Sequence, residues 1–144
     1  MAPGASADPP ASPAFAWPVR VYWEDTDAGG VVYYANYLRF FERARSEWLR
    51  SLGVDQQALL QETGCMFVVS EVHARYLHSA RLGDELFVTA TLHERGRARL
   101  TLHQQVLCPA RTASALCEAT IRLGWVDRDG RPTRIPTPLL HSLP

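Results

Sequence analysis

One long amphipathic segment, from Asn36 to Leu52, constrains the fold of this 144-residue chain more than any other feature. Apolar side chains recur there at helical spacing, at Tyr37, Phe41, Ala44, Trp48 and Leu52, while arginines and glutamates occupy most of the other positions. Further apolar residues widen this stripe beyond what a surface helix carries. We therefore predict one helix of about four to five turns that lies against a sheet.

The ends of this helix carry residues that favour starting and stopping. Asn36 is predicted to be the N-cap, and Gly53 is predicted to stop the helix just past its last turn. A shorter helix is expected in "VDQQALLQETG", with Asp55 as its cap and Gly64 after its end.

Five other segments have the character of β-strands. "WPVRVYWED" precedes the long helix, and "CMFVVSEVHARYL", "DELFVTATLHE", "ARLTLHQQVLC" and "ASALCEATIRLGWVD" follow it. The loops between the last four are too short for helical crossovers, so these strands should be antiparallel. The predicted fold is α+β, a curled sheet wrapped on a central helix. We expect a single domain over residues 16–144 after a disordered Pro/Ala-rich tail, residues 1–15.

Charge and composition exclude several classes of partner. Fifteen basic residues balance fifteen acidic ones, which leaves no global field to attract nucleic acid or an anionic membrane. The start lacks the features of a secretory signal, and no apolar run is long enough to span a bilayer, so we expect a soluble, cytoplasmic protein without membrane insertion. Cys65, Cys108 and Cys117 are interpreted as buried reduced thiols without a nucleophilic role.

The stretch "WEDTDAGGVVYYANY", residues 23–37, concentrates the candidate chemistry. Glu24, Asp25 and Asp27 offer the hard oxygen ligands of a metal ion, but a strand would send residue 24 to the opposite face from 25 and 27. Neither a calcium-loop pattern nor a nearby histidine supports a metal, and the glycine pair lacks the rest of a phosphate loop. We expect no metal and no cofactor. Two readings stay open, a polar turn and the placement of one catalytic carboxylate.

The order of parts favours catalysis: a carboxylate, a glycine pair, an apolar run and then a helix start. The first amides of a helix lack internal partners and carry the positive end of its dipole, so the backbone near Tyr34 and Ala35 can stabilise a developing oxyanion. A carboxylate seven or eight residues earlier could face the same point. Such a pair suits acyl transfer.

The segment "VYWEDTDAGGVVYYANYLRFFERARSEWLR" closely resembles the hot-dog-fold acyl-CoA thioesterases of the 4-hydroxybenzoyl-CoA thioesterase superfamily. Within that superfamily it is most similar to the branch associated with the Tol-Pal system, the YbgC type. A second match lies at "EVHARYLHSARLGDEL", and the likeness runs from about Trp17 to Leu139. It implies a hydrolase of acyl-CoA built as a homodimer or homotetramer, with active sites at the dimer interface. It also assigns the catalytic carboxylate to Asp27 and the carbonyl-polarising amide to Tyr34.

The resemblance leaves the mechanism and the substrate open. Many members of the YbgC-type branch carry His where this chain has Tyr34, a change that keeps the backbone amide but unsettles the substrate assignment. Because a thiol has a pKa of roughly 8.5, a thiolate leaves without a strong general acid. Asp27 could then activate water or attack the carbonyl itself, while Asp25 is expected to bond backbone and shape the turn.

The remaining candidates concern binding. Gly29, Gly30 and Val31 adjoin the carboxylate and are expected to contact the substrate, while Arg95 and Arg97 beside the "RGR" turn are candidates for the phosphates of coenzyme A. His78 is the histidine that most merits testing. The alternative to an enzyme is a non-catalytic hot-dog module that binds an acyl chain or an acyl carrier protein.

Overall fold

The computed structural model describes residues 15–144, which form one antiparallel sheet and three α-helices. The strands, in the spatial order β1-β3-β4-β5-β2, are β1 (Phe15–Arg20), β3 (Glu85–Arg95), β4 (Arg99–Leu107), β5 (Cys117–Val126) and β2 (Met66–Tyr76). The helices are α1 (Asn36–Ser51), α2 (Gln56–Thr63) and α3 (Thr137–Ser142). Every pair of neighbouring strands is antiparallel, as predicted.

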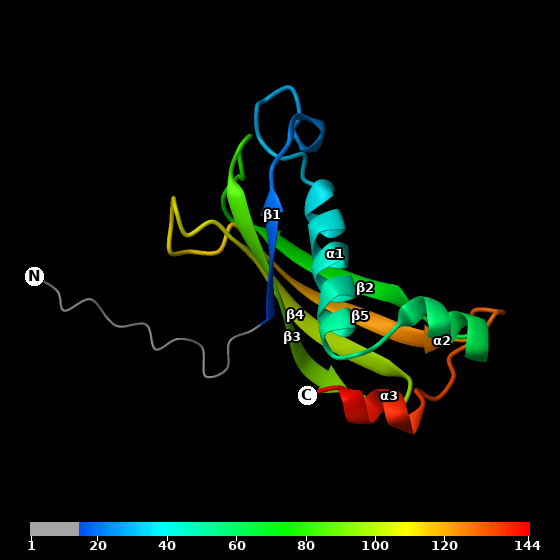
Figure 1. Ribbon diagram of the computed structural model, residues 1–144. Coiled ribbons are helices and arrows are strands. Elements are labelled where there is room, and N and C mark those ends of the chain that lie inside the picture. Colours follow the sequence, from blue (N-terminus) through cyan, green and yellow to red (C-terminus); the bar gives the residue numbers. More distant parts are fainter. Residues whose placement is uncertain (1–14) are drawn as a thin grey trace, which may run out of the picture.

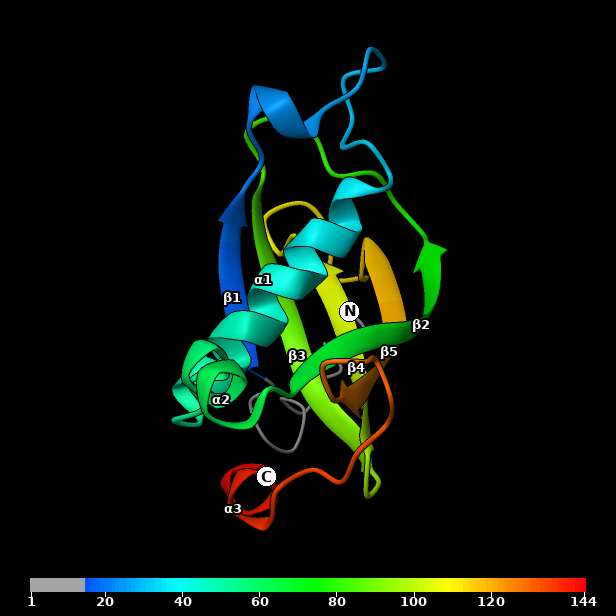
Figure 2. The same ribbon diagram turned by 90° about the vertical axis from the view of Figure 1, so that its right-hand side faces the viewer.

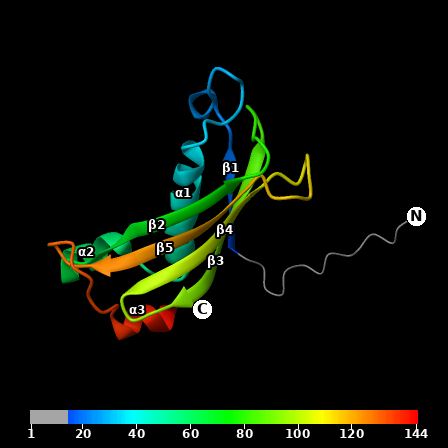
Figure 3. The ribbon, with the colours of Figure 1, turned by 180° about the vertical axis from the view of Figure 1, so that it is seen from behind.

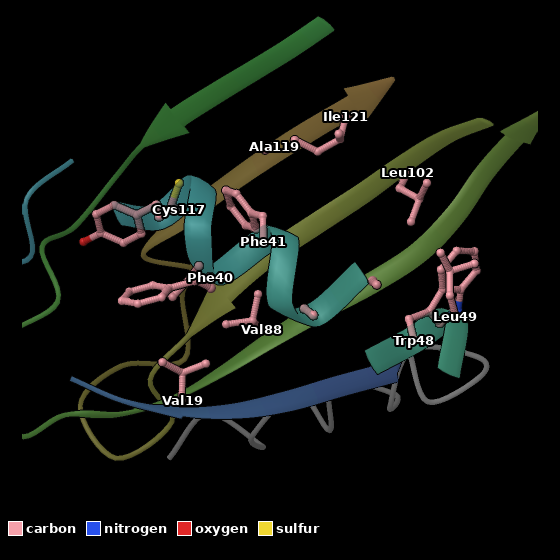
Figure 4. Close-up of a cluster of buried hydrophobic side chains, with 14 of the residues drawn as sticks. Val19, Phe40, Phe41, Trp48, Leu49, Val88, Leu102, Cys117, Ala119 and Ile121 are labelled. Atoms are coloured by element: carbon pink, nitrogen blue, oxygen red, sulfur yellow. The ribbon is translucent and has the colours of Figure 1, made fainter. Parts of the chain in front are cut away.

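The sheet curls around α1, which crosses its inner face (Figures 1 and 2). Phe40, Phe41 and Ala44 on the helix are completely buried. They meet inward-facing side chains of the strands, among them Val88 and Ile121 (Figure 4). Seen from behind, no helix of residues 15–144 lies in front of the outer face of the sheet (Figure 3). The expected α+β architecture, a curled sheet around one long helix, is confirmed.

The start of α1 differs from its prediction. Asn36 is the first helical residue and Ala35 is the N-cap, without a side-chain cap. The Asn36 side chain instead donates a hydrogen bond of 2.9 Å to the carbonyl oxygen of Asp25. It therefore ties the helix start to the preceding loop and does not cap the helix. The other helix ends match their predictions, because Asp55 accepts from the Ala58 N–H, and the glycines after α1 and α2 adopt left-handed conformations.

One further boundary and one element differ from the sequence predictions. β1 ends at Arg20, and Trp23–Asp25 form a 3₁₀ turn where an extended strand was expected. The C-terminal helix α3 was not predicted; its core contact is Leu139. The predicted tail lies outside the described residues except for Phe15, which opens β1. Within residues 15–144, no helix is long and apolar enough to cross a membrane.

Candidate active site

Asp27 sits in a tight turn whose backbone and side chain are both fixed. Its N–H donates to the Val31 carbonyl oxygen at 2.9 Å, and its own carbonyl oxygen accepts from the Gly30 N–H at 3.0 Å. The Gly29 N–H donates to Oδ1 of Asp27 at 2.8 Å. Gly30 has a φ of +77°, a conformation that side-chain-bearing residues rarely adopt. The glycine pair thus shapes the turn and holds the carboxylate.

Asp25 has a structural position, as expected. Its Oδ2 accepts a hydrogen bond of 2.8 Å from the Tyr22 N–H. Its carbonyl oxygen accepts from the Tyr33 N–H and from the Asn36 side chain, both at 2.9 Å. These bonds fasten the loop to the beginning of α1, so Asp25 supports the turn that carries Asp27.

Asp27 and Tyr34 line the same cavity, of about 250 Å³. Its wall also includes Val31 from the loop, Tyr37 from α1, Tyr76 from the end of β2 and His78 from the connection between β2 and β3. Within residues 15–144, no hydrogen bond is recorded for the backbone N–H of Tyr34, which lies in the turn just before α1. The cavity therefore brings together Asp27 and Tyr34, which lies two positions before the first residue of α1 and one before its N-cap, Ala35.

Three tyrosines form an aromatic wall on this cavity. The ring of Tyr76 packs edge-on against those of Tyr34 and Tyr37, with centroid distances of 5.9 Å and 5.5 Å. Tyr37 Oη accepts a hydrogen bond of 3.0 Å from the Ala80 N–H. Burial raises the pKa of Tyr37 and of Tyr76 above the ordinary phenol value, so both remain neutral near pH 7. Sequence reasoning read both as helix or strand residues and missed their place in the cavity wall.

The other predicted residues fall into two groups. Val31 and His78 line the cavity with Asp27, whereas Gly29 and Gly30 do not line it and instead shape the turn. His78 thus joins the candidate site from a segment distant in sequence.

Arg95 and Arg97 lie at the opposite end of the sheet. Arg95 ends β3, ten residues beyond Glu85, or roughly 33 Å along an extended strand. The Arg95 guanidinium donates to the Leu140 carbonyl oxygen at 3.1 Å, and the Arg97 carbonyl oxygen accepts from the Ile135 N–H at 2.8 Å. A single chain does not bring these arginines to Asp27.

Other groups lack the features of a reacting site. Larger hollows of about 590 Å³ and 430 Å³ lie around α2, but they hold neither Asp27 nor the start of α1.

The three cysteines are free; Cys108 and Cys117 are buried as expected, whereas Cys65 is only half-buried. Burial raises the pKa of the Cys117 thiol to about 12, which disfavours the nucleophilic thiolate. In the described part of the chain, no group of three or more His, Cys, Asp or Glu side chains could hold a metal ion.

Comparison with known proteins identifies a family model and relatives that this chain resembles. The family model of the thioesterase-like superfamily matches residues 21–143. The acyl-CoA thioesterase YbgC of Haemophilus influenzae is 46% identical over 113 residues, which cover 78% of this chain and 81% of the relative. The acyl-CoA thioester hydrolase YbgC of Escherichia coli O6:H1 is 43% identical over 113 residues, covering 78% and 82%.

Solved structures share the architecture. A probable thioesterase from Bartonella henselae superposes with a TM-score of 0.78 at 32% identity, covering 85% of this chain and 99% of the other. A mutant of 4-hydroxybenzoyl-CoA thioesterase, solved with 4-hydroxybenzoyl-CoA, gives a TM-score of 0.84 at 18% identity, covering 92% and 100%. The likeness to these structures confirms the hot-dog fold.

Proposed function

The chain belongs to the thioesterase-like superfamily and is a thioester hydrolase, and from that premise we propose that it hydrolyses acyl-CoA at the cavity shared by Asp27 and Tyr34. One observation carries the proposal: Asp27 and Tyr34, the latter in the turn just before α1, line one cavity. The two YbgC relatives, both named for action on acyl-CoA, support the substrate class. A non-catalytic binding module would not require this pairing.

The proposed chemistry assigns one task to each group. The thioester oxygen lies toward the Tyr34 N–H, which stabilises the negative charge that develops on it. Asp27 either takes a proton from an attacking water or attacks the carbonyl carbon and forms an anhydride that water then cleaves. In both routes a C–O bond forms, the C–S bond breaks and the departing thiolate takes up a proton.

A single turnover in ¹⁸O-labelled water tests for direct attack, because only that route can release a first acid without the label, whereas cleavage of an anhydride on its acyl side gives a labelled acid as the first route does. If Asp27 activates water, the acid released in the first turnover carries the label. If Asp27 attacks directly and water then cleaves the aspartyl side of the anhydride, the first acid carries an unlabelled oxygen from the enzyme.

The cavity favours compact acyl groups. Its volume of about 250 Å³ is below the usual range for drug-sized ligand pockets, roughly 300–1,000 Å³, and its wall of tyrosines offers edges to an aromatic ring or a short chain.

A series of CoA esters from acetyl to palmitoyl, with hydroxybenzoyl and with matched acyl carrier protein thioesters, tests the proposal through release of free thiol. We expect the highest kcat/KM for compact acyl groups on CoA. A clear preference for palmitoyl would overturn the proposed acyl class. Tight binding of acyl groups without any hydrolysis would overturn the enzymatic proposal in favour of the binding module.

We also propose that the active unit is a homodimer joined along β2. This edge strand of eleven residues pairs only with β5 in the described part of the chain. It exposes Met66, Val69, Val72 and Tyr76, each between 39% and 46% accessible. An edge strand with exposed apolar side chains can pair with another strand, and a second copy provides one. A homotetramer would require a further contact between such dimers.

In this dimer, the two arginines that lie far from Asp27 within one chain would lie near Asp27 of the other chain. Met66 and Arg95 lie at one end of the sheet, while Tyr76 and the Asp27 loop lie at the other. Antiparallel pairing of β2 with its copy brings the opposite end of the second sheet beside Asp27. Arg95 and Arg97 of the partner subunit would then face the phosphates of a bound CoA.

The free cysteines support a reducing, cytoplasmic location.

A further inference from the structure

The connection between β2 and β3, residues 77–84, is packed directly against the loop that carries Asp27. Arg81 forms an antiparallel bridge with Val31, and the Val32 N–H donates to the Ala80 carbonyl oxygen at 2.9 Å. Ala80 is completely buried, and its own N–H binds Tyr37 Oη. Figure 1 shows this connection beside the loop before α1. The Ala80 peptide thus joins the Asp27 loop to the helix.

Arg111, in the loop between β4 and β5, also binds this connection. One guanidinium nitrogen, Nη2, donates to the Ser79 carbonyl oxygen at 2.9 Å and to Oδ2 of Asp84 at 2.6 Å. That carboxylate oxygen also accepts the Arg81 N–H at 2.8 Å. Arg111 therefore holds both ends of the Ser79–Asp84 turn through a single group.

The Arg111–Asp84 pair differs from the other ion pairs in this region. The two side chains are 30% and 13% accessible, whereas those of Arg75 and Glu118 are 64% and 28% accessible. The hydrogen bond with Asp84 is the leading cause of a raised Arg111 pKa. Shielded, hydrogen-bonded pairs fix geometry more firmly than exposed ones, which contribute little.

We propose that Arg111 is a positioning residue for thioester hydrolysis. It acts through Asp84 and the 77–84 connection to hold Val31 and Val32, and through them the Asp27 carboxylate, at the cavity. The Asp27 N–H completes this chain of contacts by donating to the Val31 carbonyl oxygen. This inference rests on the proposed function, because it requires that Asp27 performs the chemistry.

The first test is the kinetic effect of Arg111→Ala. Because a displacement of about 1 Å can lower a rate by roughly 10²-fold, we expect kcat to fall by about 10- to 10²-fold while KM changes by less than about threefold. Arg111→Lys keeps the charge but not the guanidinium geometry and should retain an intermediate kcat. Arg50→Ala removes an exposed pair with Glu47 in the last turns of α1, away from the Asp27 cavity, and serves as the matched control, with unchanged kcat.

The decisive test combines Arg111→Ala with Asp27→Asn. If Arg111 acts by positioning the carboxylate, its removal costs nothing further once that carboxylate is gone, so the double variant should match Asp27→Asn alone. Should Arg111→Ala lower kcat by the same factor in both backgrounds, its role is structural and the positioning proposal is overturned. Arg111→Lys provides the same comparison if the alanine variant does not fold.

The kcat of Asp27→Asn alone shows whether the proposed function has failed or only the proposed role of Arg111. Near-normal kcat in that variant contradicts the proposed function, and the positioning role falls with it. A large loss in Asp27→Asn, together with equal factors for Arg111 in both backgrounds, overturns only the role of Arg111.

Discussion

The backbone N–H of Gly29 donates a hydrogen bond of 2.8 Å to Oδ1 of Asp27, and a Cβ atom placed at Gly29 would lie 3.1 Å from that same oxygen. Such a contact is tighter than side chains normally tolerate, so the carboxylate must shift by a few tenths of an ångström to accept it. Gly29 is therefore coupled to the reacting group, although it does not line the cavity.

Gly29→Ala should therefore lower kcat by about tenfold, because the backbone accepts alanine while the carboxylate is displaced. Thermal unfolding should change little. Gly30→Ala provides the contrast, because its φ of +77° makes a side chain costly, by about 1 to 2 kcal/mol of folding stability. Steady-state kinetics and melting temperatures of the two variants check the distinction. Unchanged kcat in Gly29→Ala would show that the carboxylate does not depend on this contact.

Tyr34 tests whether the backbone amide or the phenol acts. Tyr34→Phe should be mild, because the amide and the ring both remain. Tyr34→Pro deletes an N–H that has no acceptor within residues 15–144, so no backbone hydrogen bond of the described fold is lost and the fold should survive. Loss of one oxyanion donor should lower kcat by on the order of 10² to 10³.

The fold of the proline variant must be verified by circular dichroism and by oligomer size, because proline also restricts Tyr33. A folded proline variant with near-normal kcat would move the oxyanion donor to another group. The same conclusion would follow if Tyr34→Phe were as inactive as Asp27→Asn.

The dimer proposal predicts the effect of a charge on the β2 edge. Val72 is 39% accessible on this strand, and Val72→Lys should leave a monomer of about 16 kDa where the parent chain forms a dimer. Thr91→Lys, on a central strand, is the control and should remain dimeric. Light scattering at micromolar concentration measures both. A parent chain that is monomeric at that concentration, yet fully active, would contradict a site shared between subunits.

The partner's arginines predict a difference between substrates. Arg97→Ala should raise KM for CoA esters by several-fold but leave KM for a truncated pantetheine thioester unchanged, because only the former carries phosphates. Added salt should act in the same direction in the parent enzyme. Equal effects on both substrates would remove Arg97 from phosphate binding.

The fold was largely predictable because its signals are local. The apolar stripe of α1 and the alternation within the strands each follow from one element and its own burial. The errors arose where distant contacts override local preference. Asn36 is a good N-cap by type, but the Asp25 carbonyl recruits its side chain. α3 is a short helix whose Leu139 is buried in the core, and the sequence around Leu139 has no pattern that predicts this contact.

The candidate site was predictable only where it is contiguous in sequence. Asp27 and Tyr34 belong to one motif, and the cavity brings both together. Tyr76 reaches the same cavity from the end of β2 and His78 from the connection after it; the sequence singled out His78, but their place beside Asp27 depends on how the sheet curls around α1. The placement of Arg95 and Arg97 was harder still, because a hairpin sends them to the far end of the sheet.

The most direct test of the account is the kcat of Asp27→Asn on the best CoA ester, measured beside Asp25→Asn. Asparagine keeps an oxygen that can accept the Gly29 N–H, so the turn should persist, but its amide is neither basic nor nucleophilic near pH 7. We expect Asp27→Asn to lower kcat by on the order of 10² to 10⁴. Asp25→Asn, whose side chain accepts the Tyr22 N–H, should lose far less. Near-normal turnover by a folded Asp27→Asn variant, or equal losses in both variants, would contradict the assignment of the chemistry to Asp27.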